Sequence, residues 1–185
     1  MFTHSDCVAL IEQMFPHYFE EDEIRAIPDD SVYCEMMMDL HAFTSFEPTR
    51  VPEGVTFSLY RDDPAPLLDA VRLVDEGWVH YYVEMDGAFC AFLDGRIASF
   101  CIIDEMGEYE FGGKRVKIGG PGCVGTVPEF RRRGIGSNMV RLANGILKER
   151  GFDFSYINYT GDAPWYAKLG YETVLRWNRK GILPE

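Results

Sequence analysis

Apolar residues recur at helical spacing in four stretches of the chain, which predicts amphipathic helices there. The first stretch, Val8 to Phe15, ends at Pro16. The second, Ser31 to Phe43, begins with a residue type that caps helices. The other two stretches, residues 65–76 and 134–150, are each followed by a glycine, which commonly ends a helix. Two amphipathic helices of this kind are therefore expected before residue 50 and two after it.

Apolar runs with alternating or continuous patterns predict strands. Residues 55–60 alternate, and two apolar runs around Asp94-Gly95 are typical of an antiparallel hairpin. Residues 107–116 are polar and glycine-rich, which indicates a turn region before a short strand at 123–127. Strands at 152–158 and 171–178 enclose a short helix. The order β-α-β-β-β-α-β-α-β predicts an α/β (α+β) fold, a mixed sheet with helices packed on it.

The segment FEPTRVPEG, residues 46–54, separates these two regions because its prolines and glycine break helices. We therefore expect an N-terminal helical extension over residues 1–50 and the main domain over residues 51–185. The extension can close over a substrate site, pack on the sheet or form a homodimer contact, and the sequence leaves these arrangements open.

Length and composition fit an ordinary globular protein, with 185 residues, 46% of them hydrophobic. No stretch approaches the roughly 18 uninterrupted apolar residues of a membrane span, and the first residues do not resemble a signal peptide. The five cysteines are scattered and form no C-x-x-C pair. Neither disulfides nor a metal site are expected, and a cytoplasmic protein that does not bind membranes is predicted.

Charge is distributed unevenly along the chain, whose net charge is −12. Residues 112–150 contain nine Lys and Arg against two Glu, a local net charge of +7, so the other residues carry −19. The basic region suits an anionic ligand. The acidic remainder disfavours nucleic acid and favours a neutral or cationic second partner.

The basic region contains VPEFRRRGIGSNMV, residues 127–140, at a predicted helix start. The first N–H groups of a helix lack intrahelical partners, and the helix dipole favours negative charge there. This favours a diphosphate cradle built from the amides of Arg132, Arg133, Gly134, Ile135, Gly136 and Ser137. A solvated basic loop that caps an ordinary helix is the alternative. The segment lacks the Gly-Lys-Ser/Thr of a Walker loop, and Met139 stands where a Rossmann fingerprint needs a small residue.

This stretch resembles the coenzyme A loop of the GNAT acyltransferase superfamily, Q/R-x-x-G-x-G/A after a strand. Arg131, Gly134 and Gly136 occupy its fixed positions. About thirty residues later, WYAKLGYE is similar to the tyrosine-x-x-leucine-glycine-aromatic signature of the same family. The resemblance extends from Val55 to Asn178 and does not include the first fifty residues.

The resemblance implies a mostly antiparallel sheet that is splayed at a central strand pair to admit acyl-CoA. It implies that the backbone of Gly125, Thr126 and Val127 binds the pantetheine arm. Asn158, at the end of a predicted strand beside that gap, is a further candidate for cofactor binding. Tyr166 matches the family tyrosine that protonates the departing thiolate. A phenol with a pKa of about 10 is a suitable donor at neutral pH, although a buried tyrosine can also serve packing alone.

The general base stays unassigned because the predicted strand IGGPGCVGTV contains no acid, whereas many relatives have a glutamate there. Pro121 also suggests that this strand starts late or is interrupted. Candidate bases elsewhere are His80, Glu84, Asp104 and Glu105, each of which also reads as an ordinary surface residue. Cys123 is interpreted as a buried thiol, since no histidine lies near it in the sequence.

The acceptor pocket is equally open, with several aromatic residues that either line it or belong to the core: Trp78, Tyr81, Tyr82, Tyr159 and Trp165. The main hypothesis is an N-acetyltransferase that transfers an acetyl group from acetyl-CoA to a primary amine of a small molecule or peptide. The rival hypothesis is a catalytically inactive CoA-binding sensor or interaction module.

Overall fold

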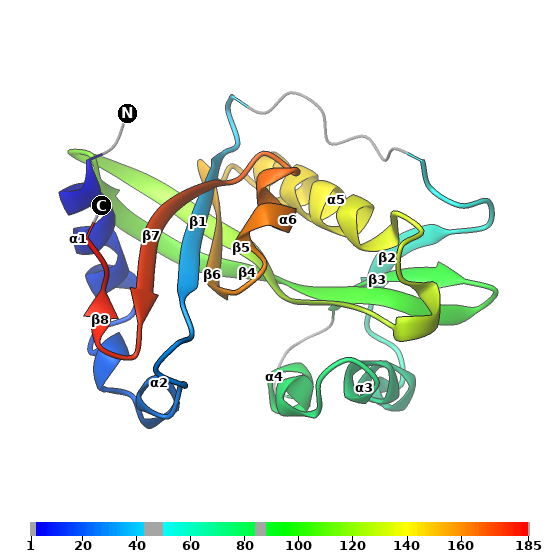
Figure 1. Ribbon diagram of the computed structural model, residues 1–185. Coiled ribbons are helices and arrows are strands. Elements are labelled where there is room, and N and C mark those ends of the chain that lie inside the picture. The colour runs from blue at the N-terminus through cyan, green and yellow to red at the C-terminus, as the bar shows by residue number, and fades with distance from the viewer. Residues whose placement is uncertain (1–2, 43–49, 84–87, 185) are drawn as a thin grey trace. The chain divides into compact units, whose positions relative to one another are not determined.

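A computed structural model describes residues 3–42, 50–83 and 88–184 of the protein (Figure 1). Over these residues the sheet has eight strands in the order β2-β3-β4-β5-β6-β1-β7-β8. The strands are β1 (Tyr33–Asp39), β2 (Thr56–Tyr60), β3 (Ala88–Leu93), β4 (Arg96–Phe111), β5 (Lys114–Thr126), β6 (Phe154–Thr160), β7 (Glu172–Asn178) and β8 (Gly181–Ile182). The pair β5–β6 is parallel, whereas β1–β6, β1–β7, β2–β3, β3–β4 and β7–β8 are antiparallel.

The α-helices of the described residues are α1 (His4–Met14), α2 (Asp22–Arg25), α3 (Pro64–Arg72), α4 (Val79–Val83), α5 (Ile135–Glu149) and α6 (Ala163–Ala167). Short 3-10 helices are η1 (Tyr18–Glu20), η2 (Glu76–Trp78) and η3 (Pro128–Phe130). None of the helices in the described part of the chain has the length and hydropathy that crossing a membrane requires. From β2 to β7 the strands and helices follow the predicted order, apart from the short helix α4, which was not predicted. The expected mixed, mostly antiparallel α/β architecture is confirmed.

The described residues form two compact units. The first unit contains residues 3–42, Glu105–Gly119 and residues 151–184. The second contains residues 50–83, residues 88–104 and Gly120–Arg150. The long strands β4 and β5 each contribute to both units, and each unit has its own hydrophobic core. The predicted domain boundary at residue 50 stays a prediction.

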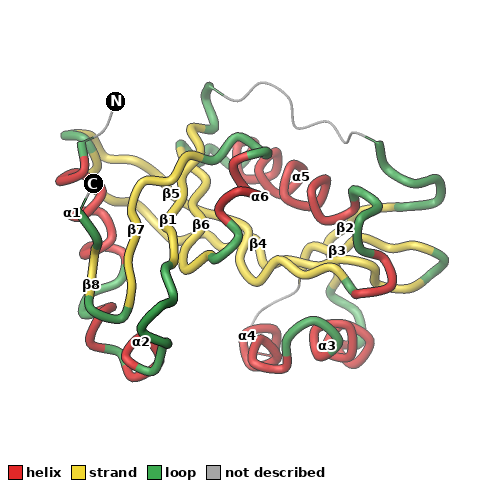
Figure 2. Tube along the Cα trace, in the orientation of Figure 1, coloured by secondary structure: helices red, strands yellow, loops and turns green. Residues whose placement is uncertain are grey.

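In the first unit, β1 lies between β6 and β7 (Figure 2). The helix predicted from Ser31 to Phe43 is therefore wrong over the described residues, and Phe43 lies outside them. The four successive residues Glu35–Met38 are all buried, as is typical of a strand that is covered on both faces. A short apolar run of this kind does not distinguish a strand from a buried helix by its periodicity. The predicted first helix is confirmed as α1, with a capping box between Thr3 and Asp6.

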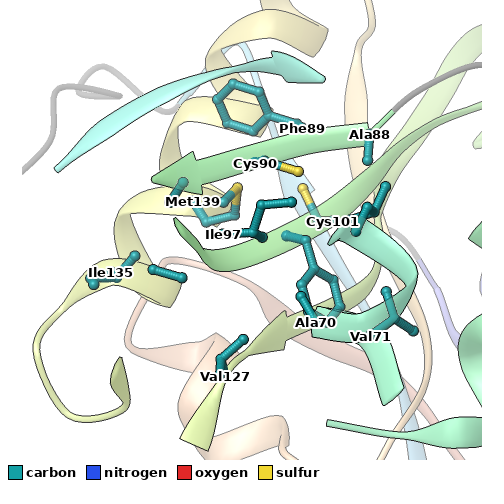
Figure 3. Packing of buried hydrophobic residues seen from close by; sticks show 14 of the residues in the cluster. Ala70, Val71, Ala88, Phe89, Cys90, Ile97, Cys101, Val127, Ile135 and Met139 are labelled. Carbon is teal, nitrogen blue, oxygen red and sulfur yellow. The ribbon is translucent and has the colours of Figure 1, made fainter. Parts of the chain in front are cut away.

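The second unit places α5 on one face of β2, β3 and β4, and α3 and α4 on the other face (Figure 1). Its core contains Met139 from α5, Val71 from α3 and Cys90 from β3 (Figure 3). Asp94 and Gly95 both have positive φ, 52° and 73°, as a two-residue type I′ hairpin turn requires. The predicted hairpin between β3 and β4 is confirmed.

Two predictions about β4 and β5 are wrong. The turn expected over residues 107–116 shrinks to Gly112 and Gly113, both with positive φ, and strand structure occupies the remainder. Phe111 and Val116 are buried here, whereas the neighbouring charged residues Glu110, Lys114 and Arg115 are exposed. Strand β5 also continues through Pro121 without interruption. The pairs between β5 and β6 involve Ile118 and Gly119, so Pro121 lies after them and its missing N–H removes no bond from that ladder.

Candidate functional site

The basic loop of the second unit connects the end of β5 to the start of α5. Gly134 is the N-cap residue with a φ of 80°, and Arg132 also has a positive φ of 61°. Gly134 has no side chain to cap the helix. The side chains of Ser137 and Asn138 donate to the Gly134 carbonyl at 2.9 and 2.8 Å, so they hold the first turn without capping its N–H groups.

Glycine is required at position 134 for two reasons. Its left-handed backbone is costly for residues with a Cβ atom, and a Cβ there would lie 3.3 Å from the carbonyl oxygen of Arg50. The loop conformation brings the amides predicted to bind diphosphate, residues 132–137, into one short turn at the positive end of α5. Gly136 and Ser137 are half-buried there, and Ile135 is buried in the core below.

The arginine side chains of the loop have different surroundings. Arg131 Nε donates to the Thr126 carbonyl at 2.9 Å, which ties the loop to the end of β5. The guanidinium of Arg133 lies 5.7 Å from the centre of the Phe130 ring. All three arginines of the loop, residues 131–133, are exposed. An exposed cation over an aromatic ring keeps its charge available to an anion in solvent.

The backbone before the loop is engaged with β4 on one edge. The Gly125 carbonyl accepts a hydrogen bond from Ser99 Oγ at 2.6 Å, and the Val127 N–H donates to the Ala98 carbonyl at 3.0 Å. Alternate residues of a strand direct their backbone groups to opposite edges, so the Thr126 N–H is directed away from β4. Of the three residues expected to contact pantetheine, Thr126 is the one whose backbone groups are not directed toward β4.

Gly125 has a packing role that the sequence did not show. A Cβ at this position would lie 2.3 Å from Cζ of Phe100, a fully buried residue of β4. No real contact is that short, so the absence of a side chain at position 125 allows β5 to pass the Phe100 ring.

Two residues before Gly125, the backbone of β5 has an unusual conformation at Cys123, with a φ of 45°. The Cys123 carbonyl accepts a hydrogen bond of 2.8 Å from the hydroxyl of Tyr82, which is 3% exposed. Burial, and to a lesser extent the carboxylates of Asp75 and Asp104, raise the pKa of the Cys123 thiol to about 11. The thiol is therefore protonated at neutral pH, which disfavours a nucleophilic role. Cys123 is half-buried, whereas a buried thiol was expected from the sequence.

Tyr166 and Asn158 belong to the first unit. Tyr166 lies in α6 and is 9% exposed, with its ring edge-on to Tyr171 at 5.6 Å and to Trp165 at 4.8 Å. The hydroxyl of Tyr171 is bonded to Ser155 Oγ at 2.7 Å, so this aromatic group is anchored to β6. Asn158 is a half-buried residue of β6. The basic loop belongs to the second unit, and the predicted opening of the sheet stays a prediction.

The candidate bases and acceptor residues are dispersed. His80, Asp104 and Glu105 are exposed, and Glu84 lies outside the described residues. Among the aromatic candidates Tyr82 belongs to the core, whereas the half-buried or exposed ones lie in both units: Trp78 and Tyr81 in the second, Tyr159 and Trp165 in the first. The acceptor pocket stays a prediction.

A buried acid of the first unit was missed by the sequence reasoning. Glu35 of β1 is 0% exposed, and its Oε1 accepts hydrogen bonds from Trp177 Nε1 at 2.7 Å and from the Tyr159 N–H at 3.1 Å. Burial raises the pKa of Glu35 to about 7, although these bonds and one with the Tyr156 hydroxyl act in the opposite direction. The one sequence signal was an acid directly before three methionines.

The sequence matches the family model described as Acetyltransferase (GNAT) domain over residues 61–174. No curated protein matches the chain significantly. Among solved structures, the chain is similar to the glucosamine N-acetyltransferase region of a fungal multi-domain GH3 beta-N-acetylglucosaminidase. The two are 23% identical with a TM-score of 0.65, and the match covers 81% of this chain and 20% of that one.

Two bacterial GCN5-related N-acetyltransferases have similar folds. The structure from Sphaerobacter thermophilus is 18% identical, has a TM-score of 0.58 and covers 93% of this chain and 54% of that one. The structure from Kribbella flavida is 16% identical, has a TM-score of 0.53 and covers 78% and 55%, respectively. The chain thus spans between a fifth and just over half of the length of these proteins, and the similarity to them is one of fold.

Proposed function

Since the chain belongs to the GNAT acetyltransferase family, we propose that it transfers an acetyl group from acetyl-CoA to a primary amine. The observation that carries this proposal is the loop at residues 131–137, whose two left-handed residues expose the uncapped start of α5. A helix start of this kind binds phosphate through its N–H groups and its dipole. The basic charge of residues 112–150 supports the same ligand.

In the proposed complex the amides of residues 132–137 bind the pyrophosphate of CoA, and the exposed Arg132 and Arg133 attract it. The Thr126 amide, directed away from β4, binds an amide of the pantetheine arm. Asn158 is a second contact for that arm. Arg131 then has an indirect role, because its bond to the Thr126 carbonyl keeps the strand end and the loop together.

In the proposed reaction the amine nitrogen attacks the thioester carbonyl carbon, a C–N bond forms and the C–S bond breaks. The departing thiolate takes the proton of the Tyr166 hydroxyl, and the tyrosinate recovers a proton from water. The proton that the amine nitrogen loses passes to water as well, since no base is assigned. A general acid in such a step contributes typically about 10²- to 10⁴-fold to the rate.

A second candidate is a CoA-binding module that does not catalyse transfer. It is favoured by the absence of Asp and Glu from the whole of β5, residues 114–126, where many relatives have a glutamate. Both candidates require the CoA cradle, and release of free CoA thiol distinguishes them.

The test begins with the thermal midpoint of the protein with acetyl-CoA, with free CoA and with adenosine diphosphate. At 100 times its dissociation constant, a ligand adds about 2.7 kcal/mol to the free energy of unfolding. We expect a saturable rise with both CoA species. No rise with either, in a folded protein, contradicts the proposal. Release of CoA thiol in the presence of an amine panel that includes glucosamine, the amine in the name of the fungal neighbour, supports the enzyme over the module.

A matched pair of variants locates the cradle. Gly134→Ala and Gly151→Ala both introduce a Cβ at nearly the same left-handed φ, 80° and 79°, at the two ends of α5. Only at Gly134 does the new Cβ approach another backbone atom. We expect both variants to lose stability because of the left-handed backbone, Gly134→Ala more so because of its contact with the Arg50 carbonyl oxygen. Only Gly134→Ala should lose the response to acetyl-CoA. An unchanged response in Gly134→Ala would place the cofactor elsewhere.

A further inference from the structure

Glu35 lies in the part of the chain that precedes the GNAT family match, which starts at residue 61. It is fully buried in β1, between β6 and β7. A buried carboxyl group is costly unless hydrogen bonds compensate for its lost hydration. Here its donors come from both neighbouring strands, the Tyr159 N–H from β6 and the Trp177 indole from β7. Glu35 therefore links three strands through one carboxyl group.

The bond to Tyr159 coincides with an irregularity in β6. The register between β1 and β6 changes from Cys34 opposite Thr160 to Met36 opposite Ile157. Glu35 is thus one residue facing two, Asn158 and Tyr159, which defines a β-bulge in β6. Tyr159 has a φ of 50°, and its N–H donates to the Glu35 side chain.

A bulge changes the direction of side chains, because one extra residue shifts the alternation of the strand by one position. Asn158 is one of the two residues of this bulge, and its direction therefore depends on the bulge being maintained. A left-handed conformation is unfavourable at a tyrosine and persists only where the surroundings hold it. The buried carboxyl group of Glu35 supplies that restraint.

We propose that Glu35 is a positioning residue for cofactor binding: its bond to the Tyr159 amide holds the β6 bulge and thereby directs Asn158 toward CoA. The inference rests on the proposed function, because it assigns to Asn158 a contact with the cofactor. It gives the N-terminal region, which the family model does not cover, a part in building the cofactor site.

The first test compares the wild-type protein with Glu35→Gln, which keeps the shape and an acceptor oxygen but cannot carry a negative charge. The measurement is the dissociation constant of acetyl-CoA by calorimetric titration between pH 5.5 and 8.5. A bond to a charged acceptor is roughly twice as strong as one to a neutral acceptor. We expect wild-type affinity to weaken roughly three- to tenfold as Glu35 takes up a proton. Glu35→Gln should show the weak affinity throughout, apart from the ligand's own pH dependence.

The assignment of that pH dependence to Glu35 is supported by its surroundings. Among the described residues, the other titratable or charged groups that interact with Glu35, Tyr156 or Cys34 are one phenol, one thiol and one guanidinium: Tyr18, Cys7 and Arg176. The ordinary pKa values of these groups all lie above about 8. Glu35, whose pKa is about 7, is the member of this group that titrates near neutrality.

A second variant tests the inference even if Glu35→Gln does not fold. The bond from the Tyr156 hydroxyl lowers the pKa of Glu35, so Tyr156→Phe raises that pKa while leaving the carboxyl group in place. The pH at which acetyl-CoA affinity weakens should then move upward. Tyr109→Phe is the control, because its hydroxyl in the same unit donates to the Met106 carbonyl at 2.6 Å and not to Glu35. An unchanged midpoint in Tyr156→Phe overturns the inference.

A double-mutant cycle tests whether Glu35 acts through Asn158. If it does, Glu35→Gln should cause no further loss of affinity in the Asn158→Ala background, whereas independent effects would add. Additive losses overturn the inference. If the wild-type protein binds acetyl-CoA and Glu35→Gln has the same affinity and pH curve, the inference alone fails. If the wild-type protein binds no acetyl-CoA, the proposed function fails and the inference fails with it.

Discussion

Gly125→Ala is the substitution whose effect the structure defines most sharply. A Cβ at this position would lie 2.3 and 2.4 Å from two ring atoms of Phe100, and Phe100 is fully buried. Either β5 or the ring must move, and overpacking of this kind costs typically about 1–3 kcal/mol. A contact this far below the van der Waals distance favours the upper part of that range.

Gly122→Ala is a matched control in the same strand. The nearest atom to a Cβ at Gly122 is Cβ of Ile102 at 3.9 Å, an ordinary contact. Neither glycine has a positive φ, so backbone strain does not differ between the two variants. The measurement is thermal and urea unfolding followed by circular dichroism. For a chain of this size about 2–3 kcal/mol corresponds to a lower melting temperature by about 4–12 °C. Gly122→Ala should remain within about 0.5 kcal/mol of the wild type.

Phe100→Leu provides the reciprocal test. If the ring is the obstacle, Gly125→Ala should cost much less in the Phe100→Leu background than in the wild type, a coupling that independent sites do not show. The reasoning is refuted if Gly125→Ala alone leaves stability within about 0.5 kcal/mol of the wild type, or if the two losses simply add.

Three further predictions concern the remaining parts of the site. Tyr166→Phe should lower kcat by about 10²- to 10⁴-fold, measured by steady-state kinetics, at an unchanged acetyl-CoA affinity, measured by calorimetry. An unchanged kcat would show that the proton for the thiolate comes from elsewhere. Tyr82→Phe should cost about 1–3 kcal/mol in chemical denaturation, because it removes the buried donor of the half-buried Cys123 carbonyl. Tyr109→Phe, whose ring is only half-buried, should cost less. Glu35 has a folded-state pKa of about 7, above the ordinary value of 4.5. Between pH 4.5 and 7 the native state therefore binds more protons than the unfolded state, so the free energy of unfolding should fall as pH rises through this range, by up to about 3 kcal/mol. Glu35→Gln should abolish this slope in unfolding measured from pH 4.5 to 8, and a slope retained in the variant would assign it to other groups.

Local patterns of the sequence determined several elements and the likeness to the GNAT family. Asp94-Gly95 predicted the β3–β4 hairpin, because both residues tolerate the positive φ of a two-residue turn. The apolar face and the terminal glycine of α5 predicted that helix closely. The loop at 131–137 was also predicted from local chemistry, since the amides of a helix start depend on consecutive residues alone. The binding role of its residues stays a prediction.

Tertiary structure decided the features that depend on residues distant in the sequence. Residues 33–39 form a strand because β6 and β7 pair with them on both sides, which their short apolar run could not reveal. The clash that keeps position 125 a glycine involves a ring 25 residues earlier in the chain. The pKa of Glu35 depends on burial and on donors more than 120 residues away. Burial and long-range hydrogen bonds are properties of the folded chain, and no local pattern of residues specifies them.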